Sequence, residues 1–506
     1  MRMKPLCRRL RRPQIGFVIM LLGVCAGAPT AFGDTSGVAL PETLQGCNLI
    51  FINIDALRAD HLGCYGYKRN TSPFIDSLAK EGLLFEEARA NSTFTRESVS
   101  VLFSGMLPCS SGAMGWYAQV PETAPTLAER FSSAGYETLF LSNTAVLAGL
   151  TRGFKTVHHL PLHWMLSTEG PKLTAIAMEH AKKIRNRPFF MYLHYFDPHG
   201  PYEPPDDLYL RFADTFYPIQ LHIFDDIRAD LNQLRKEGFG PGDPRFEDMI
   251  IRYDAEIADS DRSIEMLFHA LRAYGMLEKT LVVIASDHGE EFLDHDWVEH
   301  GWTLHEEVLR VPLILWAPGK IPAARVKAPV SVVDYYPTLA RLFGLPTDGS
   351  TLDGEALFQP ADSGLRLTPP SRPFIAELML QERAMTRCVI VDGWKYLAAR
   401  KRFTPSERPN EVRQLEEVQL GLQAGTVPMT DVWGPPVFEE LYSLSDDPRE
   451  TKNVLEEQAA MREKLRAILE KHEKTCRERG IATPPRQEVP ALSQEELDLL
   501  HCMGYF

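Results

Sequence analysis

Short apolar runs alternate with amphipathic stretches along most of this chain. Several runs lack the polar alternation of a half-exposed strand, as expected for strands that are buried on both faces. The runs are residues 49–54, 138–141, 189–194, 281–285 and 311–316. Between them, helical periodicity marks residues 72–81, 126–134 and 247–271. This alternation predicts an α/β fold with a central, largely parallel sheet flanked by helices.

The C-terminal part of the chain follows a different pattern. Residues 346–373 are rich in proline and contain glycine, which is typical of a linker. Two strand-like runs joined by an Asp-Gly turn follow, and then a charged helix; they are residues 388–391, 392–393, 394–398 and 456–479. We therefore expect a catalytic domain over residues 45–345 and a smaller α+β domain over residues 374–506. The charges of the C-terminal helix indicate a solvated face, and the small domain shows no catalytic cluster.

The N-terminus has the pattern of a signal peptide. Four arginines, Arg8, Arg9, Arg11 and Arg12, precede an apolar run over residues 15–28, and small residues follow. The run is short for a membrane span, so residues 1–33 are predicted to be a cleaved signal. We expect an exported protein, periplasmic or extracellular, with no stable membrane domain after the signal is removed. An uncleaved N-terminal membrane anchor is the alternative.

Composition and charge narrow the classes of partner. The 506 residues are 44% hydrophobic and 24% charged, which is ordinary for a soluble globular protein with more than one core. A net charge of −14 argues against nucleic acid as a partner, because phosphate backbones are bound by basic patches. The eight cysteines are irregularly spaced, so no zinc–thiolate site is predicted. One or two disulfides are permitted outside the cytoplasm.

Acidic and imidazole side chains follow two of the predicted strands. Asp55 comes directly after the run 49–54, and Asp287 and His288 follow the run 281–285. Ligands of α/β folds gather beyond the carboxyl ends of the strands, so these side chains are expected to converge. Two carboxylates and an imidazole suit one divalent ion, which could be Ca, Mg, Mn or Zn. Taken alone, Asp55 could equally cap the helix that follows it.

Thr95 stands at the start of a predicted helix in the segment NSTFTRESVSVLFSG. The free N–H groups and the dipole of a first helical turn favour negative charge, such as an alkoxide or an ester oxygen. An ordinary N-cap is the alternative for a threonine at this place. A nearby divalent ion would lower the pKa of the hydroxyl and make it a nucleophile.

Two histidines are further candidates for chemistry. His199 lies in a proline-rich loop after the run 189–194, and His300 follows Asp287 in the segment EHGWTLHEE. Loops at strand ends often carry functional side chains. The other nearby histidines, His194, His295 and His305, are interpreted as structural.

Several segments, in this order, resemble the sulfatase family. They are INIDALRADHLGCYGYKRNTSPFIDSLAKEGLLF, the Thr95 segment, GYETLFLSN, YFDPHGPY, SDHGEEF and HGWTLHEEVLRVPLIL, and ELYSLSDDPRETKNV resembles the C-terminal domain of that family. The resemblance spans residues 47–453 and implies a sulfatase-like sandwich. Sulfatases belong to the alkaline-phosphatase superfamily, whose members hydrolyse or transfer sulfuryl and phosphoryl groups with a bound divalent metal.

The resemblance implies a role for each candidate residue. It makes Asp55, Asp287 and His288 metal ligands, Thr95 the nucleophile, His199 and His300 catalytic contacts of the ester, and Asn143 and Arg96 contacts of the substrate.

The chain departs from the family pattern at its most reactive positions. Ala56 stands where most sulfatases have a second acid, and His300 stands where many have a lysine. Thr95 replaces the Cys or Ser that becomes formylglycine, and Glu97 and Val99 replace the Pro and Arg of the maturation motif. A formylglycine hydrate expels sulfate through its second hydroxyl, whereas a threonine ester must be cleared by an activated water or acceptor.

The candidate set also resembles that of phosphoethanolamine and phosphoglycerol transferases, which use a threonine nucleophile. Those relatives have several membrane helices, whereas no such segment follows residue 28 here. The sequence thus predicts an exported, metal-dependent hydrolase of sulfate or phosphate esters, with phosphoesters or phosphonates favoured. Its substrate would be a small anionic ester or a sulfated or phosphorylated glycan or lipid. A transferase to a carbohydrate or lipid acceptor and a non-catalytic binding protein are the alternatives.

Overall fold

The computed structural model describes residues 38–479, apart from 41–42, 116–118, 161–168, 214–230, 232, 348–351, 363, 381–383 and 403–432. The predicted signal peptide, residues 1–33, lies outside the described residues. Among the residues described, no helix combines the length and apolar character needed to cross a bilayer.

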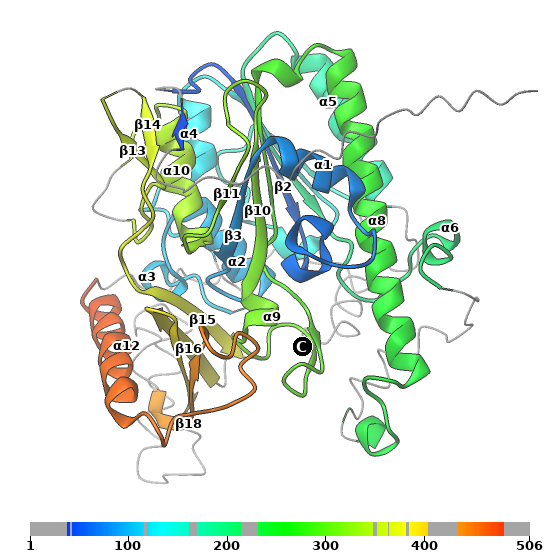
Figure 1. Cartoon of the computed structure of the whole chain (residues 1–506). Helices are drawn as coiled ribbons and strands as arrows, with labels where there is room; N and C mark the ends of the chain where they lie inside the picture. Colours follow the sequence, from blue (N-terminus) through cyan, green and yellow to red (C-terminus); the bar gives the residue numbers. More distant parts are fainter. Residues whose placement is uncertain are drawn as a thin grey trace, which may run out of the picture.

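A nine-stranded sheet forms the centre of the described chain (Figure 1). Its strands lie in the order β11-β3-β10-β7-β2-β6-β4-β5, and β12 also pairs with β3. Their bounds are Asn48–Ile54 (β2), Leu83–Arg89 (β3), Glu137–Ser142 (β4), Thr156–His159 (β5), Phe189–Tyr195 (β6), Thr280–Ala285 (β7), Arg310–Trp316 (β10), Ala324–Val326 (β11) and Val330–Ser331 (β12). Pairing is parallel except where β10 meets β7 and β3. The predicted, largely parallel sheet is therefore confirmed.

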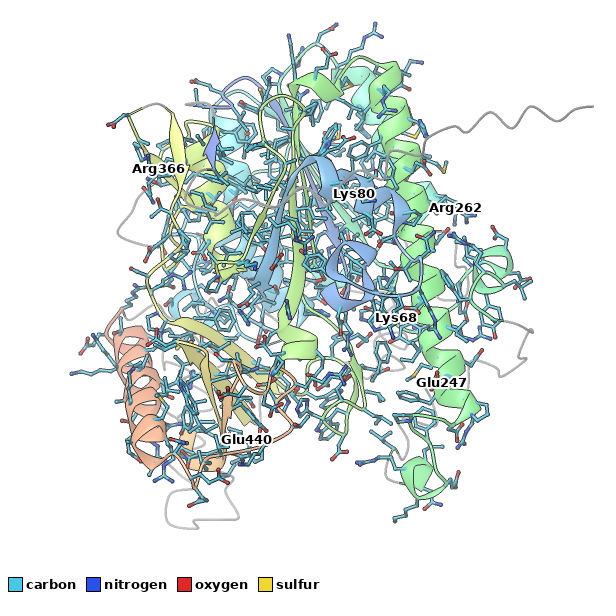
Figure 2. The ribbon with its side chains drawn as sticks, viewed as in Figure 1. Lys68, Lys80, Glu247, Arg262, Arg366 and Glu440 are labelled. Atoms are coloured by element: carbon cyan, nitrogen blue, oxygen red, sulfur yellow. The ribbon has the colours of Figure 1, made fainter. Side chains whose placement is uncertain are left out.

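Helices cover both faces of this sheet. Those described are Pro73–Glu81 (α1), Thr95–Ser104 (α2), Pro108–Ser111 (α3), Leu127–Ser133 (α4), Glu169–Ile184 (α5), Asp206–Tyr209 (α6), Pro244–Ala273 (α8), Glu306–Leu309 (α9), Tyr335–Leu342 (α10) and Ala459–Arg479 (α12). In Figure 1, α1, α5 and α8 lie on one side and α4 and α10 on the other. Charged side chains such as Lys80 of α1 and Glu247 of α8 are exposed at the surface (Figure 2).

Strand β2 shows why its sequence lacks polar alternation. Leu49 and Phe51 pack into the hydrophobic cluster on one face, while Ile50, Ile52 and Ile54 pack into the cluster on the other. Because successive side chains of a strand point to opposite faces, a strand between two helical layers must be apolar at every position.

The proline-rich stretch expected to be a linker is folded onto the large core. Within it, β13 (Phe358–Pro360) and β14 (Leu365–Leu367) pair antiparallel, and β14 also pairs with β1 (Ala39–Leu40). Phe358, Leu365 and Leu367 are buried in the cluster that lies under α10. The linker prediction was wrong. It rested on the proline content of this stretch, whereas the short alternation of apolar residues in it forms two strands.

The C-terminal part forms a separate antiparallel sheet covered by α12 (Figure 1). Its strands are Phe374–Leu380 (β15), Ala384–Val391 (β16), Trp394–Arg402 (β17) and Trp433–Ser443 (β18). Asp392 and Gly393 have positive φ angles of 52° and 76° between β16 and β17. Two successive residues with positive φ are what a tight hairpin turn requires, and Asp-Gly accepts them readily. The predicted strands, turn and helix are confirmed.

Buried charges join the two sheets. The ammonium of Lys395, on β17, is fully buried and lies 2.8 Å from Glu450 and 3.3 Å from Glu306 of α9. Glu306 also pairs with Arg89 of β3 at 2.9 Å. Burial alone would raise the pKa of Glu306, but the charges of Arg89 and Lys395 lower it to about 2.

Substituting Lys395→Met should destabilise the protein strongly, because two buried carboxylates lose a counter-charge. The expected loss of unfolding free energy is about 3–5 kcal/mol, measured by urea unfolding. Lys464→Met is the matched control, since Lys464 pairs at 3.8 Å with Asp392 and both side chains are exposed. The control should lose less than about 1 kcal/mol. Equal losses in the two variants would contradict the importance of the buried cluster.

Candidate active site

The carboxyl ends of adjacent parallel strands bring the predicted acids together. Strand β2 lies between β6 and β7, and Asn53 is in register with both His194 and Ala285. Asp55 follows the end of β2 and Asp287 follows the end of β7, and each is only 1% exposed. The expected convergence of the two carboxylates at one sheet edge is present.

His288 faces both acids. Its Nε2 lies 3.5 Å from Asp55 Oδ1 and 3.7 Å from Asp287 Oδ2. Its Nδ1 is 3.0 Å from the carbonyl oxygen of Gly289, which can only accept a hydrogen bond. The neutral imidazole therefore carries its proton on Nδ1 and turns the lone pair of Nε2 toward the acids. Residue 289 must be glycine, since a Cβ there would lie 2.1 Å from the Glu307 carbonyl oxygen.

The arrangement of these three groups fits a divalent cation. Asp55 Oδ1 and Asp287 Oδ2 are buried without a hydrogen-bond partner. Burial, and next the charge of Asp287, raise the pKa of Asp55 well above its usual range. Two buried carboxylate oxygens and an imidazole lone pair repel one another electrostatically when they point at the same place. A cation between them would remove this repulsion. Oxygen-rich ligation with one imidazole is a common donor set for divalent metals.

Thr95 is the first residue of α2, and its hydroxyl oxygen lies 3.0 Å from His288 Nε2. The N-cap residue of this helix is Phe94, and no side chain caps it. The N-cap interpretation of Thr95 was therefore wrong. Ser98, one turn later, donates its hydroxyl to the backbone carbonyl of Asp287 at 2.7 Å and so fixes α2 against the end of β7.

A row of imidazoles extends from the acids. The ring centroid of His300 lies 4.2 Å from that of His288 and 4.6 Å from that of His199. His300 Nδ1 is 2.9 Å from a carboxylate oxygen of Glu290, and His199 Nδ1 is 2.7 Å from the Gly200 carbonyl oxygen. Each Nδ1–H donates a hydrogen bond to its acceptor. The ring nitrogen that remains for exchanging a proton with substrate or water is therefore Nε2.

The two residues expected to contact substrate differ in their surroundings. Asn143, just after β4, is 1% exposed, and neither polar atom of its side chain has a hydrogen-bond partner. A buried amide without partners is costly, so a polar ligand would stabilise it. Arg96 instead donates to the carbonyl oxygens of Val146 and Ala148 at 2.6 and 2.8 Å. Burial lowers the pKa of Arg96 to about 10, still well above neutrality.

His194, interpreted from the sequence as structural, belongs to this site. Its Nε2 lies 3.0 Å from Asp55 Oδ2, and Asp55, His194 and Asp287 are close enough to share an ion. Its Nδ1 lies 3.2 Å from the amide nitrogen of Asn53, which donates, so Nε2 carries the proton and donates to Asp55. Burial lowers the pKa of His194 to about 4, so the ring is neutral. His194 therefore orients Asp55, and His288 offers the lone pair.

Glu290 is a second residue that sequence reasoning missed. It is 1% exposed, and it receives the Tyr202 hydroxyl at 2.9 Å on the carboxylate oxygen that does not face His300. The residue lies in the segment SDHGEEF, but nothing in that segment shows which acid turns toward a histidine ten positions later.

Ala56 occupies the place of the second acid that the resemblance implies. Its backbone is left-handed, with φ of 54°, and its carbonyl oxygen accepts the Tyr253 hydroxyl at 2.7 Å. Among the described residues, Asp55 and Asp287 are the two carboxylates of the candidate cluster of metal ligands.

Comparison with known proteins agrees with the resemblance to sulfatases found in the sequence. An arylsulfatase of Clostridium perfringens is 24% identical over 54% of this chain and 69% of its own length. A Delta 4,5-hexuronate-2-O-sulfatase of Bacteroides thetaiotaomicron is 22% identical over 80% of this chain and 84% of its own length. The crystal structure of a phosphonate monoester hydrolase of Agrobacterium radiobacter shares the fold, with a TM-score of 0.61 and 17% identity over 86% of this chain and 96% of that chain.

The model of the Sulfatase family matches residues 47–345, more than half of the chain, and this stretch carries every side chain of the site described above. The protein therefore belongs to the sulfatase family of sulfuric ester hydrolases.

Proposed function

We propose that this enzyme hydrolyses anionic esters through a covalent ester on unmodified Thr95, and that phosphate and phosphonate esters are its preferred substrates. The observation that carries the proposal is the position of the Thr95 hydroxyl, 3.0 Å from His288 Nε2 and at the start of a buried helix. The helix start favours a developing alkoxide, and the contact with His288 Nε2 puts that oxygen beside the proposed metal ligands.

Asp55, Asp287 and His288 would hold the divalent ion. When bound, that ion would lower the pKa of the Thr95 hydroxyl and balance the charge of the ester anion. His194 holds Asp55 in place, and Ser98 holds the backbone of Asp287.

The remaining residues perform the two steps of the reaction. Thr95 Oγ1, after its proton has passed to solvent, attacks the phosphorus or sulfur atom, and the bond to the leaving alcohol breaks as Nε2 of a protonated His199 or His300 gives that oxygen a proton. A water molecule then attacks the central atom of the Thr95 ester and returns one proton to the imidazole, and the anion leaves as the bond to Thr95 Oγ1 breaks and that oxygen regains its negative charge. Asn143 would bind an oxygen of the anion through its amide.

Thr95 is the reason for favouring phosphorus esters. Formylglycine arises from Cys or Ser and breaks its sulfate ester from the hydrate, a route closed to a threonine side chain. The second step must then occur at the central atom. Phosphoryl groups pass readily between oxygens when cations and imidazoles stabilise the redistributed charge. The similarity to a phosphonate monoester hydrolase is compatible with this preference. We also propose that the enzyme is exported, from its N-terminal arginines and apolar run.

A matched panel of 4-nitrophenyl esters tests the substrate class. We expect kcat/KM for a phosphodiester or a phosphonate monoester to exceed that for the aryl sulfate by more than about tenfold, equivalent to about 1.4 kcal/mol of transition-state stabilisation. Faster turnover of the sulfate would contradict the preference while leaving family membership intact.

The nucleophile can be tested by substitution and trapping. Thr95→Ala should lower kcat by at least about 10³-fold, because the attacking oxygen is removed, while Thr95→Ser should retain turnover. Mass spectrometry of enzyme quenched during turnover should show the adduct on the peptide that contains Thr95. Ser100→Ala is the control, since the Ser100 hydroxyl of the same helix only bonds to the Arg96 carbonyl. Undiminished activity in Thr95→Ala would rule out the mechanism.

Metal dependence follows from the partnerless carboxylates. Chelation should abolish turnover, and added divalent metal should restore it. Asp287→Asn should lose both the catalytic ion and activity, because a neutral amide is a weak ligand for a hard cation. Asp294→Asn is the control, since Asp294 pairs at 2.7 Å with Arg58 and lies partly exposed. Elemental analysis of both variants measures the difference, and equal metal content with equal activity would contradict the site.

A further inference from the structure

A second cluster of potential metal ligands lies where α12 packs on α3. Cys109 of α3 and Cys476 of α12 are 8% and 7% exposed, and both are thiols. They pack with three buried methionines, Met114, Met379 and Met385. The proposed reaction uses none of these residues.

A histidine and a buried carboxylate lie next to this pair of thiols. His472 precedes Cys476 by one helical turn, and its Nε2 lies 3.6 Å from Cys476 Sγ and 3.3 Å from Glu377 Oε1. Glu377, on β15, is fully buried. One ligand atom from each of Cys109, His472 and Cys476 lies within 4.8 Å of the other two.

We propose that Cys109, Cys476, His472 and Glu377 bind a structural zinc ion, distinct from the catalytic metal. Two thiolates, one imidazole and one carboxylate form a four-ligand set that closes a tetrahedral zinc site. From the usual bond lengths, such a site places imidazole nitrogen about 3.3 Å from carboxylate oxygen and about 3.6 Å from thiolate sulfur. These separations agree with those between His472, Glu377 and Cys476.

The surroundings of the sulfur atoms suit thiolates bound to a metal. Arg387 Nη2 lies 3.7 Å from Cys109 Sγ, and the Ser110 hydroxyl lies 3.7 Å from Cys476 Sγ. Arg387 also donates to Glu377 at 2.7 Å. Hydrogen-bond donors of this kind orient the ligands of metal sites and stabilise their charge. Zinc and the Arg387 guanidinium together balance the two thiolates and Glu377.

The position of the site indicates a structural role. Cys109 follows the end of α2, the helix that carries Thr95, by five residues, and its backbone N–H donates to Glu377 at 2.7 Å. A zinc ion here would join α3, the small sheet and α12, which are distant in sequence. Because metal ligands stabilise the folded chain only when they are brought together, zinc binding would favour this packing.

Cobalt substitution tests the site in the full-length protein, without relying on activity. The Asp287→Asn protein should retain one zinc ion per chain, and its cobalt form should show strong near-ultraviolet thiolate-to-cobalt absorption. Only a site with thiolates gives that absorption, and the catalytic site has none. Adding Cys109→Ser and Cys476→Ser should abolish both signals, whereas Cys388→Ser, buried in the adjacent cluster, should leave them unchanged.

Two results would overturn the proposal. One is an unsubstituted protein that holds no thiolate-bound cobalt or zinc, a readout that does not depend on any variant folding. The other is a purified protein in which peptides carrying Cys109 and Cys476 are joined by a disulfide. Neither result bears on Thr95 or its reaction, so this proposal and the proposed function fail separately.

Discussion

The interaction on which the site depends is the repulsion between two buried carboxylates. Asp55 and Asp287 end neighbouring parallel strands, so the sheet itself places their charges together in a dry environment. Protein groups relieve only part of this repulsion, through hydrogen bonds such as those from the His194 ring to Asp55 and from the His288 backbone N–H to Asp287. Under the proposed function a cation would balance these charges, and the Thr95 hydroxyl, 3.0 Å from His288 Nε2, would lie in its field. The proposed metal site and the proposed nucleophile thus depend on the same electrostatic requirement.

Hydrogen bonds on the far side of each ring give the histidines distinct tasks. Asn53 donates to Nδ1 of His194 and makes that ring a donor toward Asp55. The Nδ1–H of His288 donates to the Gly289 carbonyl and leaves Nε2 facing the acids, while the Nδ1–H of His300 donates to Glu290 and leaves Nε2 for proton exchange. Under the proposed function, these identical side chains would thus act as a support, a ligand and an acid.

The sequence predicted the site residues that directly follow strands. It missed the site residues whose position depends on which strands pair with one another. Asp55 and Asp287 were found because apolar runs precede them and parallel strands end at one edge. His194 could not be placed, since only the pairing of β2 with β6 sets it beside Asp55. Likewise, β3 and the strands β13 and β14 are too short or too mixed in composition to be recognised locally. The irregular spacing of the cysteines predicted no zinc–thiolate site, because only the packing of α12 on α3 brings Cys109 beside Cys476.

The left-handed backbone of Ala56 lowers the stability of the fold but fixes the position of the neighbouring Asp55. This conformation costs a non-glycine residue roughly 1–2 kcal/mol, and glycine would avoid most of that strain. Yet residue 56 is where the chain turns away from β2 directly after Asp55, held by the Tyr253 hydroxyl and by the hydrogen bond from the Leu57 amide to Ser286. A more pliable residue would let the carboxylate drift. Selection for a more stable fold and selection for a precisely positioned Asp55 therefore favour different amino acids at position 56.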